Sequence, residues 1–123
     1  MSQYKIYQIN IGDIRKKVNE LGREAASQKF PRFFAYEETN TFGSEKWEPD
    51  WFGFYSWVID LELEDGLYID ELEAVFSILN SDMRGATPVD FFRSLSVGDI
   101  VKDVAQKRYY MVDSVGFTEI AVE

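Results

Sequence analysis

Acidic side chains are concentrated in one short stretch of this 123-residue chain. Between residues 60 and 73 there are seven carboxylates and no Lys or Arg. They are Asp60, Glu62, Glu64, Asp65, Asp70, Glu71 and Glu73. Such a cluster could form an electronegative surface that docks on a basic groove of another protein and speeds their association. It could also be a solvated face, in which the last three acids complement the dipole at a helix N-terminus.

A calcium loop and the common catalytic sites are excluded by residue types and spacing. A calcium-binding loop that begins at Asp60 requires Gly at its sixth position, but Asp65 stands there and Gly66 is seventh. The chain has no Cys and no His, which removes disulfides, thiolate and imidazole metal sites, and Ser–His or Cys–His pairs. It also has no Gly-rich phosphate-binding loop. We therefore expect a protein that is not an enzyme and that holds no cofactor and no metal.

The distribution of charge favours a basic protein as the partner. Thirteen Lys and Arg against 22 Asp and Glu give a net charge of −9. Residues 1–36 are basic, whereas residues 37–83 hold thirteen acids and the single base Lys46. Direct nucleic-acid binding needs clustered positive charge, and this acidic middle would repel a phosphate backbone.

Aromatic residues gather just before the acidic stretch and could serve as contacts. Trp51, Tyr55 and Trp57 share the spacing of the apolar side of an expected strand, so we expect them in the core. Trp47 lies in an expected loop, and Phe52 and Phe54 have the opposite spacing. These last three could pack internally or anchor a partner, because large aromatics are frequent in interface hot spots.

The elements that position these residues follow from periodicity and turn signals. We expect strands over residues 3–11, 33–38 and 51–63, and a loop over residues 39–50. A helix with Asp13 as its N-cap is expected over residues 14–25, because apolar residues recur there on one helical face. A second helix is expected over residues 70–79, because Asp70 and Glu73 form a capping box. In that helix Ile69 and Ala74 could form a hydrophobic staple.

The last third of the chain has the layout of a meander. After a connection over residues 81–94, strands are expected over residues 99–104, 108–113 and 117–122, separated by short turns. The sum is one α+β domain over residues 1–123, with a mainly antiparallel sheet, two helices and a C-terminal three-stranded meander. Since no signal peptide and no membrane-spanning run is visible, we expect a cytoplasmic protein.

The C-terminal half resembles the YodL-like family. The resemblance begins with Leu72-Glu73 before an apolar helix that ends at Phe76 and Asn80, and the opening run at residues 4–8 (YKIYQ) resembles the family's first strand. It continues through the run SLSVGDIV at residues 94–101, Tyr109-Tyr110, and the run DSVGF at residues 113–117.

The resemblance implies a small accessory domain without catalytic residues, of the kind carried by Gram-positive bacteria, phages and mobile elements. Combined with the charge, it suggests an inhibitor that occupies the basic surface of a host nucleic-acid-handling protein, such as a CRISPR or restriction effector. The alternative is a host regulatory or scaffold domain that binds a structural partner through exposed aromatics. For the matched residues we favour structural roles: Gly98 and Gly116 in turns, and Asp99 and Asp113 bonded to turn amides.

Overall fold

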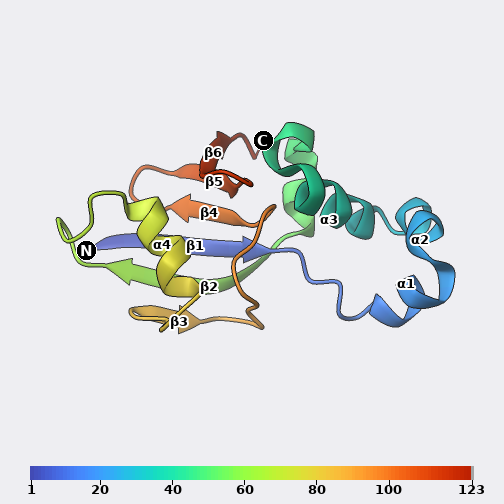
Figure 1. Cartoon of the computed structure of the whole chain (residues 1–123), viewed down its shortest axis with the longest axis horizontal. Coiled ribbons are helices and arrows are strands. Elements are labelled where there is room, and N and C mark those ends of the chain that lie inside the picture. Colours follow the sequence, from blue (N-terminus) through green and yellow to red (C-terminus); the bar gives the residue numbers. More distant parts are fainter. Residues whose placement is uncertain (123) are drawn as a thin grey trace.

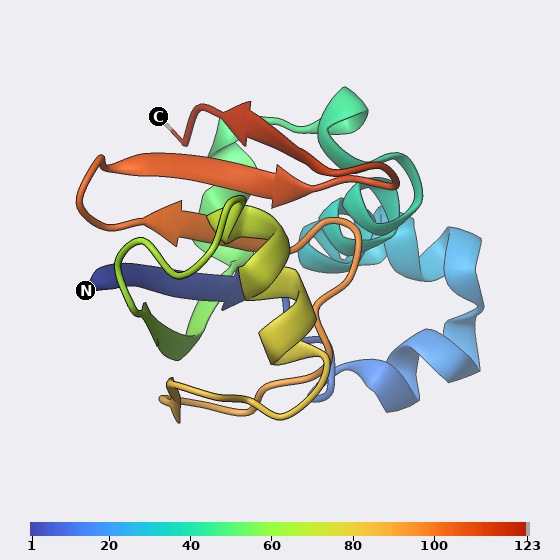
Figure 2. The same cartoon turned by 60° about the vertical axis from the view of Figure 1, so that its left-hand side comes forward.

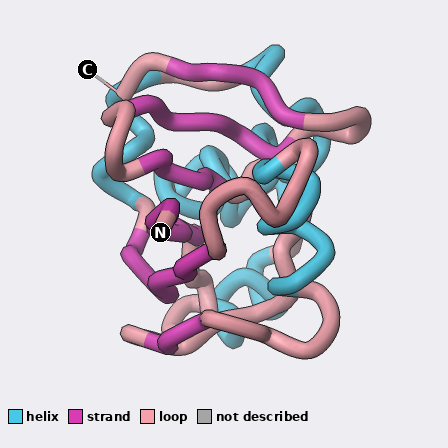
Figure 3. The backbone as a smooth tube through the Cα atoms, turned by 90° about the vertical axis from the view of Figure 1, so that its left-hand side faces the viewer, coloured by secondary structure: helices cyan, strands magenta, loops and turns pink. Residues whose placement is uncertain are grey.

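The protein is built around one six-stranded antiparallel sheet in the computed structural model, which describes residues 1–122. The strands are β1 (Ser2–Gln8), β2 (Ser56–Leu63), β3 (Ala86–Pro88), β4 (Ile100–Asp103), β5 (Arg108–Val112) and β6 (Phe117–Ile120). Their order across the sheet is β3-β2-β1-β4-β5-β6, which can be followed from bottom to top in Figure 3. Strands β4, β5 and β6 pair in succession, as a meander does, and they extend the sheet from β1.

The expected α+β class is confirmed, but the expectation of two helices is wrong. The described residues form four α-helices: α1 (Arg15–Leu21), α2 (Arg23–Lys29), α3 (Pro31–Phe42) and α4 (Glu71–Leu79). Two 3₁₀ helices, η1 (Gly43–Lys46) and η2 (Pro49–Phe54), follow α3. None of the helices in residues 1–122 is long and apolar enough to cross a bilayer.

One face of the sheet is covered by α4, which lies across β1 and β2 in Figure 1. Tyr4 and Ile6 of β1 pair with Leu61 and Ile59 of β2, and all four side chains are buried with the apolar side of α4. The capping box is confirmed in part, since the Glu73 amide donates to the Asp70 carboxylate at 3.2 Å. The sequence pattern therefore predicts α4 and the part of the expected strand that forms β2, Ser56–Leu63.

The aromatic stretch before β2 is not a strand, contrary to expectation. Pro49 opens the 3₁₀ helix η2, and β2 begins only at Ser56. A bulge at Val58 then shifts the register, so that Trp57 pairs with Tyr7 on the face opposite α4. Trp57 is consequently 39% exposed, and its expected place in the core is wrong. Its ring instead lies under the Lys5 ammonium, 3.6 Å from the ring centroid.

The helices α1, α2 and α3 project beyond one end of the sheet, as Figure 2 shows. The single helix expected over residues 14–25 is divided at Gly22, whose φ of 84° requires a residue without a Cβ. The expected strand at residues 33–38 lies within α3, where Pro31 occupies the first turn and Phe33 is buried. Asp13 is not the N-cap of α1, since its carboxylate accepts from Arg32 at 2.8 Å.

Candidate functional site

The acidic stretch is gathered at one end of the molecule. It runs from the end of β2 through the loop at residues 64–70 into the first turn of α4, at the left of Figure 1. The basic helices α1 and α2 occupy the opposite end. Asp60 and Glu62 lie on the sheet face opposite α4, whereas Asp70 and Glu73 lie on the α4 side. The acids therefore surround the end of the molecule and do not form one flat patch.

Three of the seven acids have a cation or a hydroxyl as partner within the domain, whereas Glu62 and Asp70 accept amide hydrogen bonds, from Gln3 at 3.4 Å and from Glu73 at 3.2 Å. Asp65 accepts from the N-terminal ammonium of Met1 at 2.7 Å, and this ion pair lowers the pKa of the carboxyl. Asp60 lies 3.8 Å from the Lys5 ammonium. Glu71 accepts from the Tyr4 hydroxyl at 2.7 Å. Burial, and then this hydrogen bond, raise the pKa of Tyr4, so the hydroxyl remains a donor.

The remaining four acids form no ion pair with any residue in the described chain. They are Glu62, Glu64, Asp70 and Glu73, and all four are exposed. Their negative charge is therefore available to a partner, because no cation of the described chain is paired with it. Within residues 1–122, no group of three carboxylates is arranged to hold a metal ion.

Two exposed aliphatic side chains lie among these acids. Leu67 is 56% exposed, and Ile69 is as exposed as an isolated residue, at 109%. The expected staple between Ile69 and Ala74 is therefore wrong, since the Ile69 side chain points to solvent. A groove of about 540 Å³ follows α4; Tyr68, Ile69 and Ile78 line it together with polar residues that include Glu73 and the Asp82–Arg84 ion pair. We call the loop at residues 64–70 together with this groove the acidic tip.

The aromatic candidates have packing roles inside the domain. Trp47 donates its indole N–H to the Ala121 carbonyl at 2.7 Å, which holds η1 close to the end of β6. Phe52 lies 5.1 Å from the ring of Tyr7 and covers the sheet face that α4 leaves open. The buried apolar residues form two clusters: the first lies between the sheet and α4, and the second includes Ile9, Ile11, Val18 and Phe33. Phe54 packs against the second apolar cluster. All three are half-buried, and whether they also contact a partner stays a prediction.

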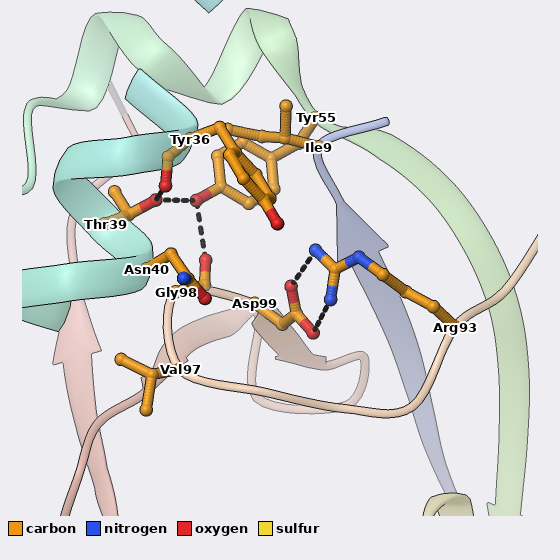
Figure 4. A pocket seen from close by; sticks show the side chains of 9 residues that line it. All are labelled: Ile9, Tyr36, Thr39, Asn40, Tyr55, Arg93, Val97, Gly98 and Asp99. Atoms are coloured by element: carbon orange, nitrogen blue, oxygen red, sulfur yellow. Dashed lines mark hydrogen bonds and ion pairs between the residues drawn. The ribbon is translucent and has the colours of Figure 1, made fainter. Parts of the chain in front are cut away.

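A buried ion pair that sequence reasoning missed joins two parts of the chain. The Arg93 guanidinium donates to both carboxylate oxygens of Asp99, at 2.9 and 3.0 Å, and Figure 4 shows the two groups face to face. Asp99 also accepts from the Ser96 amide and from the Gln8 side-chain amide. Burial raises the pKa of Asp99, and Arg93 opposes that rise. The expected turn role of Asp99 is confirmed by the Ser96 bond, but its main partner was not predicted.

Next to this ion pair, hydrogen bonds and close packing attach α3 to the turn before β4. The Tyr55 hydroxyl donates to the Gly98 carbonyl at 2.6 Å and lies beside the Thr39 hydroxyl, as drawn in Figure 4. Gly98 has a φ of 94°, and a Cβ there would lie 2.9 Å from the Thr39 backbone. The arrangement is closely packed and leaves no space for a water molecule. We therefore assign these residues to the scaffold.

Asp113 joins the β5–β6 turn to η1. Its Oδ1 accepts from the Ser44 amide at 2.7 Å, and its Oδ2 accepts from the hydroxyls of Ser44 and Thr118. Burial opposes ionisation of Asp113, but these hydrogen bonds prevail and lower its pKa. A lowered pKa means that this stabilisation is fully present above the ordinary carboxyl pKa and is lost as the pH falls from there through the lowered pKa of the folded protein.

Replacement of Asp113 by Asn is expected to destabilise the domain in a pH-dependent way. The Asn amide nitrogen cannot accept from the two hydroxyls, so we expect a loss of about 1 kcal/mol at neutral pH after allowance for solvent. Below about pH 4 the carboxyl takes up a proton in the unfolded chain, whereas the lowered pKa keeps it ionised in the folded protein, so the difference should shrink as the pH falls. Urea denaturation at pH 7 and pH 3 measures it, with Asp50→Asn as an exposed control. A difference that stays constant between the two pH values would contradict the assignment.

Comparison with known proteins identifies the family. The sequence model of the YodL-like domain matches residues 3–122, which is nearly the whole chain. No curated protein and no solved structure matches the chain significantly. The match covers the sheet, the basic helices and the acidic tip together, and it extends the resemblance seen in the C-terminal half. The chain therefore belongs to the YodL-like domain family.

Proposed function

We propose that this domain is a non-catalytic protein-binding module that docks its acidic tip on a basic and apolar surface of another protein. The observation that carries the proposal is the exposure of Leu67 and Ile69 among unpaired carboxylates. Interfaces need apolar anchors to supply affinity, and a surrounding ring of charge supplies orientation and rate. A solvated acidic face would not require a fully exposed Ile at its centre.

The chemistry of the acidic tip supports a partner that offers both cationic and apolar side chains. Glu64, Asp70 and Glu73 would face Lys or Arg side chains, while Ile69 and the groove beside α4 would receive apolar ones. A basic groove that normally holds nucleic acid offers both kinds of contact. We therefore propose a nucleic-acid-handling protein as the target, inhibited because its basic surface is occupied. An anti-restriction or anti-CRISPR role encoded by a phage or mobile element is the specific form of this proposal.

Replacement of Ile69 by Ser tests the anchor. Because Ile69 makes no buried contact, the variant should keep the wild-type melting temperature. We expect the partner captured from a bacterial lysate at low salt to be reduced about ten-fold in this variant. Quantitative mass spectrometry of the captured proteins measures the change.

The matched control is Val115→Ser in the β5–β6 turn, where the side chain is also 90% exposed. Val115→Ser should capture the same proteins as the wild type. Capture should also fall when the salt concentration is raised to about 0.5 M, because the Debye length is then only a few ångströms and the attraction between the charges is screened. Capture that is unaffected by salt and by Ile69→Ser would contradict docking through the acidic tip and favour an apolar scaffold contact elsewhere.

A further inference from the structure

A second concave site lies at the junction between the sheet and the basic helices. It is a cavity of about 230 Å³ between the end of β1, α3 and the segment before β4. Ile9 and Ile11 of the second apolar cluster line it together with Val58 of the first cluster. The cavity therefore touches both halves of the core and lies away from the acidic tip.

The charged groups that line this cavity are cationic. Arg15 at the start of α1 and Arg93 both contribute to its wall, and no carboxylate does. Asp99 pairs with Arg93 and offsets its charge, but Asp99 does not itself line this cavity. Arg15 is exposed and has no ion pair with any of residues 1–122. Arg93 is paired with Asp99, so Arg15 is the lining cation whose charge stays uncompensated within the described residues, and this charge favours an anion in the cavity.

Aromatic side chains supply the remaining wall. Tyr36 of α3 lies beside the Arg93 guanidinium, whose carbon is 5.9 Å from the ring centroid, and Figure 4 shows the two side chains together. Phe91 lines the cavity but is itself 71% exposed. A flat apolar group in the cavity would cover the exposed Phe91 ring and remove it from water.

We propose that this cavity binds a small aromatic carboxylate. The carboxylate would pair with Arg15 and the free edge of Arg93, because guanidinium donors match carboxylate oxygens in geometry. The ring would lie against Tyr36 and Phe91. The volume is below the roughly 300–1,000 Å³ of sites for drug-sized ligands, so the ligand has about one ring. This site is independent of the proposed docking surface.

Titration of the ¹⁵N-labelled domain with benzoate, followed by amide shifts, tests the proposal. We expect saturable shifts at residues around the cavity with a roughly millimolar Kd, as suits a ligand of this size. Benzamide has the same shape without the charge and should bind at least five-fold more weakly. Arg15→Gln and Phe91→Ala should each weaken benzoate binding at least five-fold, and neither change removes a buried contact of the fold.

Two neighbouring substitutions are matched controls. Lys16→Gln removes the same charge one residue along α1, and Val89→Ala removes an exposed apolar side chain from the same segment as Phe91. Both variants should bind benzoate within two-fold of the wild type. The proposal is overturned if the shifts do not saturate, if benzamide binds equally well, or if Arg15→Gln behaves like Lys16→Gln.

Discussion

Replacement of Asp99 by Ala is expected to lower the free energy of unfolding by about 3 kcal/mol. Asp99 is 1% exposed and is held by Arg93, Ser96 and Gln8, so its loss leaves the Ser96 and Gln8 donors unsatisfied and the Arg93 guanidinium, whose side chain is 33% exposed, without its counterion. A domain of this size has a total stability of about 5–15 kcal/mol, so the variant should unfold at much lower denaturant concentration. Equilibrium denaturation by urea, followed by circular dichroism, measures the change.

Two controls separate the buried ion pair from a general effect of removing an acid. Asp103→Ala removes a half-buried carboxylate from the neighbouring strand β4, where Asp103 accepts one hydrogen bond from residues 1–122, from the Gln106 amide, and it should cost about 1 kcal/mol. Arg93→Ala combined with Asp99→Ala should cost less than the sum of the single changes, because the double variant leaves no unpaired charge. Additive losses would mean that the two residues do not act as a pair.

Replacement of Gly98 by Ala is expected to cost about 3 kcal/mol. Part of the loss, about 1–2 kcal/mol, comes from the positive φ of 94°, which a residue with a Cβ adopts only under strain. The rest arises because the new Cβ would lie 2.9 Å from the Thr39 backbone, which must move away. The Tyr55 hydrogen bond to the Gly98 carbonyl would be displaced with it. Thermal denaturation should show a clear fall in melting temperature.

Gly116→Ala isolates the part due to backbone strain. Gly116 also has a positive φ, of 70°, but a Cβ there would meet nothing within 4 Å. This variant should lose only about 1–2 kcal/mol. If Gly116→Ala is as destabilising as Gly98→Ala, the close contact between the β4 turn and α3 contributes nothing to stability.

The parts of the fold that could be predicted from sequence are those with a strong local signal. The alternation that ends at Leu63 and the cap at Asp70 predict β2 and α4, because burial on one face and a satisfied N-terminus are both local properties. The final three strands are separated by short turns and were predicted for the same reason.

The errors arise where tertiary contacts override local preference. The aromatic run at residues 33–38 has strand propensity, yet the turn opened by Pro31 places Phe33 and Tyr36 on one side of a helix that packs on the second apolar cluster. The bulge at Val58 is invisible to a period-two pattern, and it moved Trp57 from the expected core to the open face of the sheet.

The site was predicted only in part. The spacing of the strand and of the helix cap predicts that the acids lie near one end of the molecule. It does not predict the ion pair between Asp65 and the N-terminus, because that pair depends on β1 lying beside β2. The pairing of Arg93 with Asp99 had a weak signal, an Asp after a turn Gly with an Arg six residues earlier, and no periodicity supports it. The sequence predicted that Ile69 packs on Ala74 as a hydrophobic staple, but Ile69 is exposed. The direction in which the loop before α4 runs decides this, and it does not follow from the local sequence.

The most direct test of docking through the acidic tip compares Glu73→Lys with Glu24→Lys in binding to the captured partner. Both acids are exposed and lie in the first turn of a helix, so the two variants share the change in net charge and the effect on the helix dipole. Glu24 lies on α2 at the opposite end of the molecule (Figure 1). We predict that titration calorimetry at low salt will show binding about ten-fold weaker for Glu73→Lys and unchanged for Glu24→Lys. Equal affinities for the two variants would contradict the account.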